Sequence, residues 1–502
     1  MLSTTLALAA TAVTLAAFAL FGVWYSRGRV GSVEDFISAR DSAGQGTLTA
    51  TLVASGMGAW ILFSPAEAGV GLGITAAIGY GVGSAAPMLA YVFVGPRIRD
   101  LMPDGHTLTE YAHVRYGSVM YAYVLVVSVG YMFIFLAADL TAITNALQFV
   151  ADVPRWQTGL LVTGFVLAYT AYGGLRASIV TDTAQALLIM PLLAVTFGGA
   201  VALLGGPAAV HGEIVAAKPA LLDPGFVPGL KLGGALVLAI LGAEMLNQAW
   251  WQRVYAGRDE ATVRRSFAVT AVAVVPIVFV AGFAGTIAAG LGLVGDHAAS
   301  NAFLLLLGAA FPPWIPFAVV LLVTLLVAST ADTLFNALSS IVTADLPRLL
   351  DDPDDATLTL GARVLTVAAG VGAVVVAVWA TSVLALFLLA DLLAAATFVP
   401  LLYGLYSRRI DQWGAVSAAV AGLVAGLSFF PSARSALVAL PGVGPLVGVL
   451  PAASLLGAFV LAVGVSAIVA LVGARVTDAR FDLGRLASDV HVFDDAEREV
   501  SD

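Results

Sequence analysis

The segment from Leu325 to Asp345 combines an apolar helical pattern with closely spaced polar side chains. These polar residues are Ser329, Thr330, Asp332, Asn336, Ser339, Ser340 and Thr343. Residues 329, 332, 336, 340 and 343 fall on one face of a helix. In a membrane-spanning helix such a face is costly unless it lines a pathway or meets partners on other helices. The adjacent hydroxyls of Ser329 and Thr330 offer two hard oxygen ligands to a small cation, provided that other helices supply the rest.

Acidic residues recur inside the apolar segments without basic partners. They are Glu67, Asp139, Glu244, Asp332 and Asp391, whereas the expected spans contain only two basic residues, Lys231 and Arg363, each within four residues of a span end. A carboxylate in a medium of low dielectric must be protonated, bind a cation or face water. The asymmetry favours a cationic guest, which could be a sodium ion, a proton or an amine. Positions near an interface, or hydrogen bonds across helices, are the alternative explanation for some of these acids.

Aromatic and amide side chains accompany the acids. Trp60 is expected in a cavity, because it follows a cluster of small residues deep in its span. Trp250 and Trp251 are expected to anchor the chain at the membrane interface, with a substrate-facing position as the alternative. Asn247 lies one helical turn from Glu244 on the same face, which suits a shared polar cavity or a packing hydrogen bond.

The composition identifies the class of protein that must position these groups. Of the 502 residues, 60% are hydrophobic and only 11% are charged, about half the charged fraction of a soluble protein. Apolar segments of about 20 residues recur along the chain, which predicts a polytopic membrane protein. The chain has no cysteine, so thiolate metal sites and cysteine nucleophiles are excluded. The five histidines are scattered, which argues against a histidine metal cluster. No phosphate-binding GxxxxGK[ST] motif occurs, which argues against an ATP-driven pump. Nucleic acid is not an expected partner, because the chain has no basic patch with interleaved aromatic residues.

The hydropathy pattern predicts an all-α fold of about thirteen transmembrane helices. The expected spans are 3–25, 47–70, 74–94, 119–149, 156–173, 180–204, 231–251, 266–291, 313–343, 360–381, 383–406, 413–430 and 450–473. The segment 205–230, rich in Pro, Gly and Ala, is expected to be an outer loop. Residues 1–475 would form the transmembrane domain, and residues 476–502 an acidic cytoplasmic tail that is mobile or carries a surface helix.

The distribution of basic residues predicts the orientation. With the N-terminus outside, the outer side keeps only Arg155, Lys218, Lys231 and Arg434. The other 19 of the 23 basic residues, Arg253 among them, are expected in inner loops or the inner tail. This agrees with the positive-inside rule. We therefore expect a multi-pass protein of the plasma membrane with a cytoplasmic C-terminus.

Two groups of five spans, at about 47–204 and 231–406, could be related by inversion. The first helix of such a group is often interrupted near mid-bilayer. The cluster Ala54-Ser-Gly-Met-Gly58 and the segment from Gly242 to Gln248 could each tolerate unwound backbone. Close helix packing is the alternative explanation for the glycines.

Five motifs resemble those of the sodium/solute symporter family, which includes sodium–proline, sodium–galactose and urea transporters. They lie between about residues 45 and 410, in family order. The motifs are Tyr172-Gly-Gly-Leu-Arg-Ala-Ser-Ile-Val-Thr-Asp182-Thr-Ala-Gln185, Ala54-Ser-Gly-Met-Gly-Ala-Trp60, Ser329-Thr330 with Asp345 fifteen residues later, Asn247-Gln-Ala-Trp-Trp-Gln-Arg253, and Phe398-Val-Pro-Leu-Leu-Tyr-Gly-Leu-Tyr-Ser-Arg408.

The resemblance implies two inverted five-helix repeats, as in the leucine transporter, and alternating access. It also implies a sodium site between the first and eighth core helices. Its ligands would be the carbonyl groups of Ala54, Met57 and Leu326 and the hydroxyl groups of Ser329 and Thr330. Asp182 matches a family acid near the inner ion exit, with a helix cap as the alternative role.

One position departs from the family pattern. Residue 56 is glycine, where relatives carry aspartate or asparagine. Carbonyl ligands do not depend on the side chain, so sodium binding is still expected, whereas the substrate cannot be inferred from proline or sugar relatives. The segment from Pro103 to Gly117 is somewhat similar to the urea-transporter branch.

We therefore expect a sodium-coupled symporter, not an enzyme, that imports a small amine, amino acid or urea-like solute by alternating access. Sodium would be the coupling ion, with no further cofactor and no obligate protein partner beyond the lipid bilayer. The candidate cavity residues are Trp60, Asp139, Glu244, Asn247 and Asp391. The alternatives are a proton-coupled solute or urea transporter and a transporter-like membrane sensor.

Overall fold

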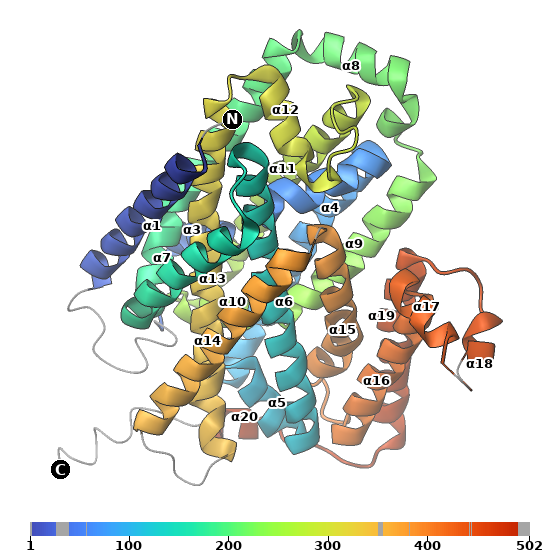
Figure 1. Ribbon diagram of the computed structural model, residues 1–502. Coiled ribbons are helices and arrows are strands. Elements are labelled where there is room, and N and C mark those ends of the chain that lie inside the picture. The colour runs from blue at the N-terminus through green and yellow to red at the C-terminus, as the bar shows by residue number, and fades with distance from the viewer. Residues whose placement is uncertain are drawn as a thin grey trace.

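The structure is a computed structural model of the whole chain. It describes residues 3–26, 40–56, 58–349, 355–380, 382–440, 442 and 444–489. Within these ranges it does not describe the side chains of residues 171–190 and 342–349, nor a few near residues 21–26, 169 and 355–359. The described residues form helices and contain no strand (Figure 1). The predicted all-α class is therefore confirmed.

The described helices follow one another along the chain. Their bounds are α1 Thr4–Ser26, α3 Gln45–Gly56, α4 Trp60–Leu101, α5 Leu108–Tyr116, α6 Ser118–Ala151, α7 Arg155–Leu203, α8 Gly206–Ala217, α9 Val227–Met245, α10 Gln248–Ala256, α11 Glu260–Gly290, α12 Ala302–Ala310, α13 Trp314–Leu349, α14 Asp355–Trp379, α15 Val383–Tyr403, α16 Gln412–Phe429, α17 Pro431–Val438, α18 Gly444–Gly448, α19 Leu455–Val476 and α20 Arg485–Ser488. Short 3₁₀ turns cover Pro219–Leu222 and Ala299–Asn301.

Helices overlap all thirteen expected spans. Within the described residues, nine helices are long and apolar enough to cross a bilayer, or ten if the end of α7 and α8, which meet at 71°, count as one broken span. The 49 residues of α7 would reach about 73 Å at 1.5 Å per residue, more than twice the roughly 30 Å of a hydrocarbon core. That length accommodates the two spans expected there, but the count of thirteen stays a prediction.

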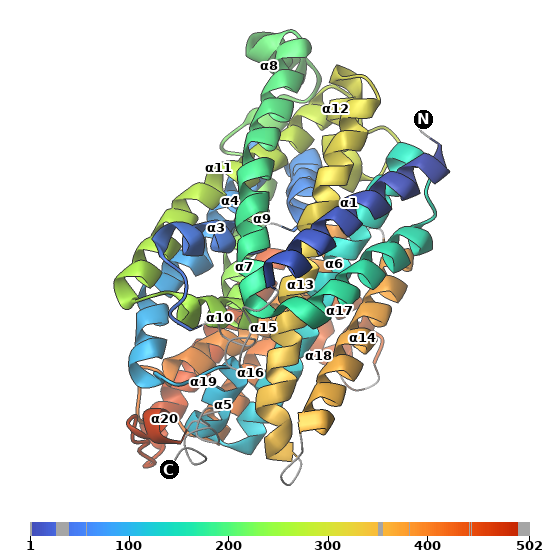
Figure 2. The same ribbon diagram turned by 90° about the vertical axis from the view of Figure 1, so that its left-hand side faces the viewer.

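The connecting helices gather at two opposite ends of the molecule. In both views α8 and α12 lie at one end, and α5 and α20 lie at the other (Figures 1 and 2). The basic-residue distribution predicts that the connections holding α8 and α12 share the outer side, and that α5 and α20 share the inner side. The arrangement therefore agrees with the predicted grouping of loops, while the absolute orientation stays a prediction.

Two expectations about connections need correction. The segment 205–230 contains the twelve-residue helix α8 and a 3₁₀ turn rather than loop alone. The first part of the tail packs against the helices, because Leu486 is fully buried and the Arg115 guanidinium lies 4.6 Å from the centre of the Phe481 ring. Residues 490–502 lie outside the described part.

Glycines allow α4 to touch its neighbours at the backbone. A Cβ added to Gly79 would lie 2.1 Å from the Cα of Gly233 on α9, and one added to Gly69 would lie 2.0 Å from the carbonyl oxygen of Gly282 on α11. Gly73 has φ of 69°, and its backbone interrupts α4. Since side chains rarely adopt this left-handed region, glycine suits the bend. α4 therefore contains the end of one expected span and the whole of the next.

Arg115 joins α5 to the connection between α15 and α16. Its buried guanidinium donates three hydrogen bonds, to the carbonyl oxygens of Gly404 at 3.1 Å, Ile410 at 3.0 Å and Ser407 at 2.7 Å. The planar guanidinium can serve several acceptors at once, which a lysine ammonium cannot do in the same geometry.

Replacing Arg115 with alanine is expected to destabilise the protein by about 2–4 kcal/mol, because carbonyl groups would be left buried without donors. The melting temperature in detergent measures the loss. Arg115→Lys should recover less than half of it. Arg97→Ala is the control, since the Arg97 side chain is one third exposed, pairs with Asp100 at the surface and donates only one hydrogen bond to a carbonyl of this connection, that of Leu405. Equal losses for the two alanine variants would contradict the role of the buried guanidinium.

Candidate functional site

The first expected helix break lies between α3 and α4. α3 ends at Gly56 and α4 begins at Trp60, so the structure confirms an interruption in the predicted cluster of small residues. The buried carboxylate of Asp139 on α6 accepts a hydrogen bond from the backbone N–H of Trp60 at 3.0 Å. A carboxylate at this position satisfies a free amide and stabilises the positive end of the helix dipole. Asp139 therefore caps the second half of the interrupted helix.

The connection requires glycine at position 58. A Cβ added to Gly58 would lie 2.2 Å from Asp139 Oδ2 and 2.5 Å from Oδ1. Even an alanine methyl group would displace the carboxylate from the amide that it caps. Gly58 and Asp139 thus form one unit, although they are far apart in the sequence.

The polar face of α13 meets this break. The side chain of Thr330 lies within interaction range of the Asp139 carboxylate. Thr330 Oγ1 and Asp139 Oδ2 are nevertheless both buried without a well-formed hydrogen bond among the described residues. An unsatisfied buried oxygen costs about 1–3 kcal/mol, so such atoms in a native fold call for an explanation such as an ion or a water. Two oxygens of this kind beside unwound backbone offer ligands to a small cation.

Arg253 connects the same helices from the other side. Its Nη2 atom donates to Ser55 Oγ at 2.9 Å and to Thr333 Oγ1 at 3.1 Å. The last turn of α3 and the turn of α13 after Thr330 are thereby held within reach of one guanidinium. The expectation that Arg253 belongs to an inner loop is wrong, because it lies on α10 and is fully buried.

The second break separates α9, which ends at Met245, from α10, which begins at Gln248. Asn247 caps α10 by accepting from the N–H of Ala249 at 3.0 Å, and its amide donates to Glu244 Oε2 at 2.9 Å. The Tyr131 hydroxyl donates to Glu244 Oε1 at 2.8 Å, and the indole N–H of Trp250 donates to Oε2. Three donors therefore fix the orientation of the Glu244 carboxylate.

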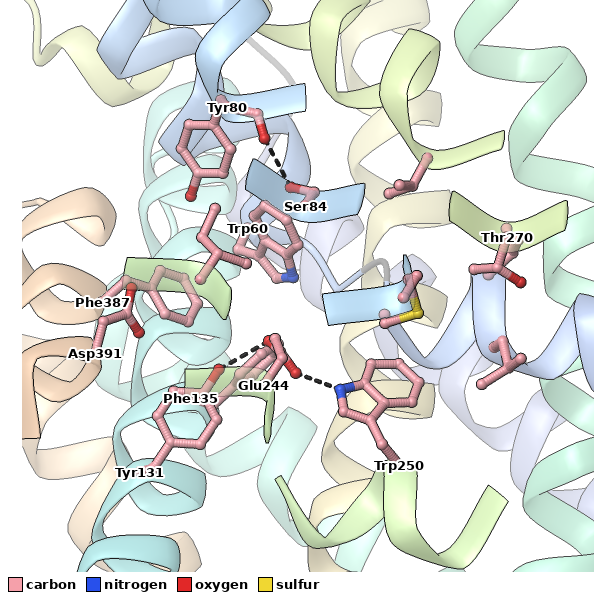
Figure 3. Close-up of a pocket in the computed structure, with 16 residues that line it drawn as sticks. Trp60, Tyr80, Ser84, Tyr131, Phe135, Glu244, Trp250, Thr270, Phe387 and Asp391 are labelled. Carbon is pink, nitrogen blue, oxygen red and sulfur yellow. Dashed lines mark hydrogen bonds between the residues drawn. The ribbon is translucent and has the colours of Figure 1, made fainter. Parts of the chain in front are cut away.

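A pocket lies beside both breaks (Figure 3). The space between its lining atoms, open solvent included, is about 590 Å³. Gly56 and Trp60, which flank the first break, both line it. The lining residues are Leu52, Val53, Gly56, Trp60, Tyr80, Ser84, Met88, Tyr131, Phe135, Ile240, Glu244, Trp250, Thr270, Val274, Phe387 and Asp391.

Aromatic rings form a continuous wall of this pocket. Trp60 stacks on Tyr80 with ring centres 5.9 Å apart, and its edge contact with Phe387 has a separation of 5.8 Å. Phe387 contacts Phe135 at 5.1 Å, and Phe135 contacts Tyr131 at 6.0 Å. Rings in this arrangement present faces that attract cations and bury methylene groups.

The two carboxylates of the pocket differ in their partners. Glu244 receives three hydrogen bonds, whereas Asp391 on α15 has no hydrogen-bond or ion-pair partner among the described residues, although it is only 3% exposed. Figure 3 shows Asp391 beside Phe387 and Glu244 between Tyr131 and Trp250. No lysine or arginine is among the lining residues.

The structure separates the predicted cavity residues into three groups. Trp60, Glu244 and Asp391 line the pocket. Asn247 lies behind it and orients Glu244. Asp139 caps the first break and is not among the lining residues.

Among the predicted sodium ligands, Ala54, Leu326, Ser329 and Thr330 are buried in the facing parts of α3 and α13. Met57 and the side chain of Asp182 lie outside the described part. The remaining intramembrane acids make ordinary contacts across helices. Glu67 accepts from the Ser382 hydroxyl at 2.6 Å, and Asp332 accepts from Thr170 at 2.7 Å.

The expectation of interfacial anchoring for Trp250 and Trp251 is wrong, because both are buried and Trp250 lines the pocket. Glycine at position 56 makes room for it: a Cβ there would lie 3.2 Å from the Trp250 ring. The sequence reasoning also missed Tyr80, Tyr131, Phe135 and Phe387. No local signal separates these rings from ordinary core residues, since their role depends on which helices meet.

Comparison with known proteins identifies the family. The model of the sodium:solute symporter family matches residues 36–422. This chain belongs to the sodium:solute symporter family. The resemblance found in its motifs is thus confirmed, and the chain is a transporter rather than an enzyme.

Two curated relatives are similar to this family member over different lengths. The spermidine transporter DUR31 of Candida albicans is 27% identical over 430 residues, which cover 83% of this chain and 78% of that protein. The urea active transporter of Saccharomyces cerevisiae is 20% identical over 246 residues, which cover 46% of this chain and only 34% of that protein.

Solved structures share the fold of this symporter. A Na⁺-coupled sialic acid symporter in a substrate-bound, outward-open state has a TM-score of 0.73 at 17% identity, covering 94% of this chain and 98% of its own. Mhp1, a nucleobase-cation-symport-1 family transporter, has a TM-score of 0.59 at 13% identity, covering 92% and 97%. These neighbours are transporters of the leucine-transporter fold, which agrees with the predicted architecture. The five-plus-five inverted repeat stays a prediction.

Proposed function

We propose that this protein is a sodium-coupled symporter of the plasma membrane that imports a small organic amine or urea-like solute by alternating access. The observation that carries the proposal is the meeting of α13 with the α3–α4 break. Thr330 Oγ1 and Asp139 Oδ2 lie there, buried and without well-formed hydrogen bonds among the described residues. Gly56 and Trp60 connect this place directly to the pocket.

The proposed sodium ligands are the carbonyl groups of Ala54, Met57 and Leu326 and the hydroxyl groups of Ser329 and Thr330. Five neutral oxygens bind a hard cation weakly enough to release it in each cycle. Asp139 adds a negative charge beside this set, which favours a cation over a water. We propose Asp182 as an acid near the inner exit of the ion.

The solute is proposed to bind in the pocket of Figure 3. Carboxylates and aromatic rings suit an amine, and the similarity to a spermidine transporter supports that class. A urea-like solute is the second candidate. It is favoured by the urea-transporter relatives and by the buried indole N–H of Trp60, which has no hydrogen-bond acceptor among the described residues and could serve a carbonyl group.

Uptake by the purified protein in lipid vesicles tests this function. Radiolabelled spermidine and urea are supplied at fixed pH, with an inward gradient of either sodium or potassium. We expect the sodium gradient to accelerate and concentrate one of the two solutes. Equal uptake with sodium and potassium would contradict sodium coupling. Accumulation driven by a pH gradient alone, without sodium, would establish proton coupling through the buried acids instead.

A further inference from the structure

The charged residues of the pocket restrict the class of solute that can bind there. Glu244 on α9 and Asp391 on α15 line the same space and lie within electrostatic reach of each other. No basic side chain lines that space. Two carboxylates at low dielectric can both be ionised only if positive charge lies beside them. A single ammonium group would leave one of them uncompensated.

The helix breaks do not supply a site for an anionic group. In broken-helix transporters the free amides at a half-helix N-terminus can bind a substrate carboxylate. Here the first three amides of α4 are already bonded, Trp60 to Asp139, Ile61 to the Gly58 carbonyl and Leu62 to the Ala59 carbonyl. At α10, the amides of Ala249 and Trp250 are bonded to Asn247. The carboxylate of an amino acid would therefore meet two negative charges, and none of these five amides is free to bind it.

The rest of the lining suits a hydrocarbon chain that carries charge at its ends. The aromatic wall from Tyr80 to Tyr131 can bind cations through ring faces and pack against methylene groups. The lining also contains aliphatic residues, which include Leu52, Val53, Met88, Ile240 and Val274. Such a surface favours an elongated and flexible solute over a compact polar one.

We propose that the pocket binds a linear diamine or polyamine, with one ammonium group at Glu244 and another at Asp391. This inference rests on the proposed function only in that it takes this pocket as the solute site. Glu244 is held in place by Tyr131, Asn247 and Trp250, so it is ready to receive a charge without reorganisation. Asp391 has no partner among the described residues, and the second ammonium group supplies one.

Binding to the purified full-length protein in detergent tests the proposal without any gradient. Calorimetric titrations compare putrescine with butylamine, which have the same carbon chain and differ by one amino group. We expect putrescine to bind roughly 30-fold more tightly, the equivalent of about 2 kcal/mol for one buried charge pair. Asp391→Asn should reduce this preference to less than about threefold and change butylamine binding little. That variant keeps the size of the side chain and breaks no hydrogen bond of the described structure.

Glu67→Gln is the matched control, because Glu67 is also a carboxylate within the spans but does not line the pocket. It should leave the preference for putrescine intact. Equal affinities for putrescine and butylamine in the wild type, or an unchanged preference in Asp391→Asn, would overturn the proposal. Sodium-driven uptake of urea without putrescine binding would overturn it while leaving symport in place. Putrescine binding without sodium-dependent uptake would support it and reject sodium symport.

Discussion

Replacing Ser329 and Thr330 together with alanine is expected to abolish the sodium dependence of uptake in a protein that still folds. The double variant removes both side-chain ligands of the proposed ion site. Thr330 Oγ1 has no well-formed hydrogen bond in the described structure, so its loss leaves no partner at that atom unsatisfied. An ion at 100 times its dissociation constant stabilises the folded state by about 2.7 kcal/mol. We expect this sodium-dependent gain in melting temperature to disappear together with sodium-driven uptake.

Thr324→Ala is the matched control for this pair. Thr324 is a buried hydroxyl on the same helix, and it donates to the Val320 carbonyl of its own helix at 2.9 Å. The control should retain both the sodium effect on stability and the sodium dependence of uptake. A sodium affinity in the double variant equal to that of the wild type would show that the ion binds elsewhere.

Substitution of Gly58 by alanine is expected to stop transport as completely as removal of the Asp139 side chain. The added methyl group would occupy the place of the carboxylate, 2.2 Å from Oδ2. The amide of Trp60 would then lose its acceptor, at a cost of about 1–3 kcal/mol, and overpacking would add a similar amount. Uptake and melting temperature measure the two effects.

A double-mutant cycle makes the second prediction specific. Asp139→Ala removes the group against which the Gly58→Ala methyl clashes. The double variant should therefore be less destabilised than the sum of the single variants by about 1 kcal/mol or more. Gly71→Ala is the control, because an added Cβ there meets no atom within 4 Å. Strict additivity of the two single effects would refute direct contact between position 58 and Asp139.

The architecture could be predicted from the sequence because membrane helices follow rules of length and composition. Apolar runs located the spans, and clusters such as Ala54 to Gly58 located the helix breaks, since small residues tolerate unwound backbone. The acids at positions 244 and 391 could be selected as cavity candidates because an ionisable side chain inside a bilayer is costly and usually has a function.

The pairing of residues across helices could not be predicted from the sequence. Asp139 was an expected cavity residue, but its carboxylate caps an amide 79 positions earlier in the chain. Trp250 was expected at the membrane interface, where tryptophan is enriched. Its contacts with Gly56 and Glu244 place it in the pocket instead. Arg253 was assigned to a loop because the distribution of basic residues along the sequence does not show that hydroxyl groups on α3 and α13 accept hydrogen bonds from it. Each of these differences depends on tertiary packing rather than on local pattern.

The glycine contacts of α4 constrain which parts of the molecule can serve as hinges. At Gly69 and Gly79 the backbone of α4 lies against α11 and α9 with no room for a Cβ. Sliding any of these helices by one residue would bring neighbouring side chains into those contacts. α4, α9 and α11 should therefore travel together as a rigid body during alternating access. The bending would then fall on joints held by single polar groups, such as the connections capped by Asp139 and Asn247 and the link made by Arg253.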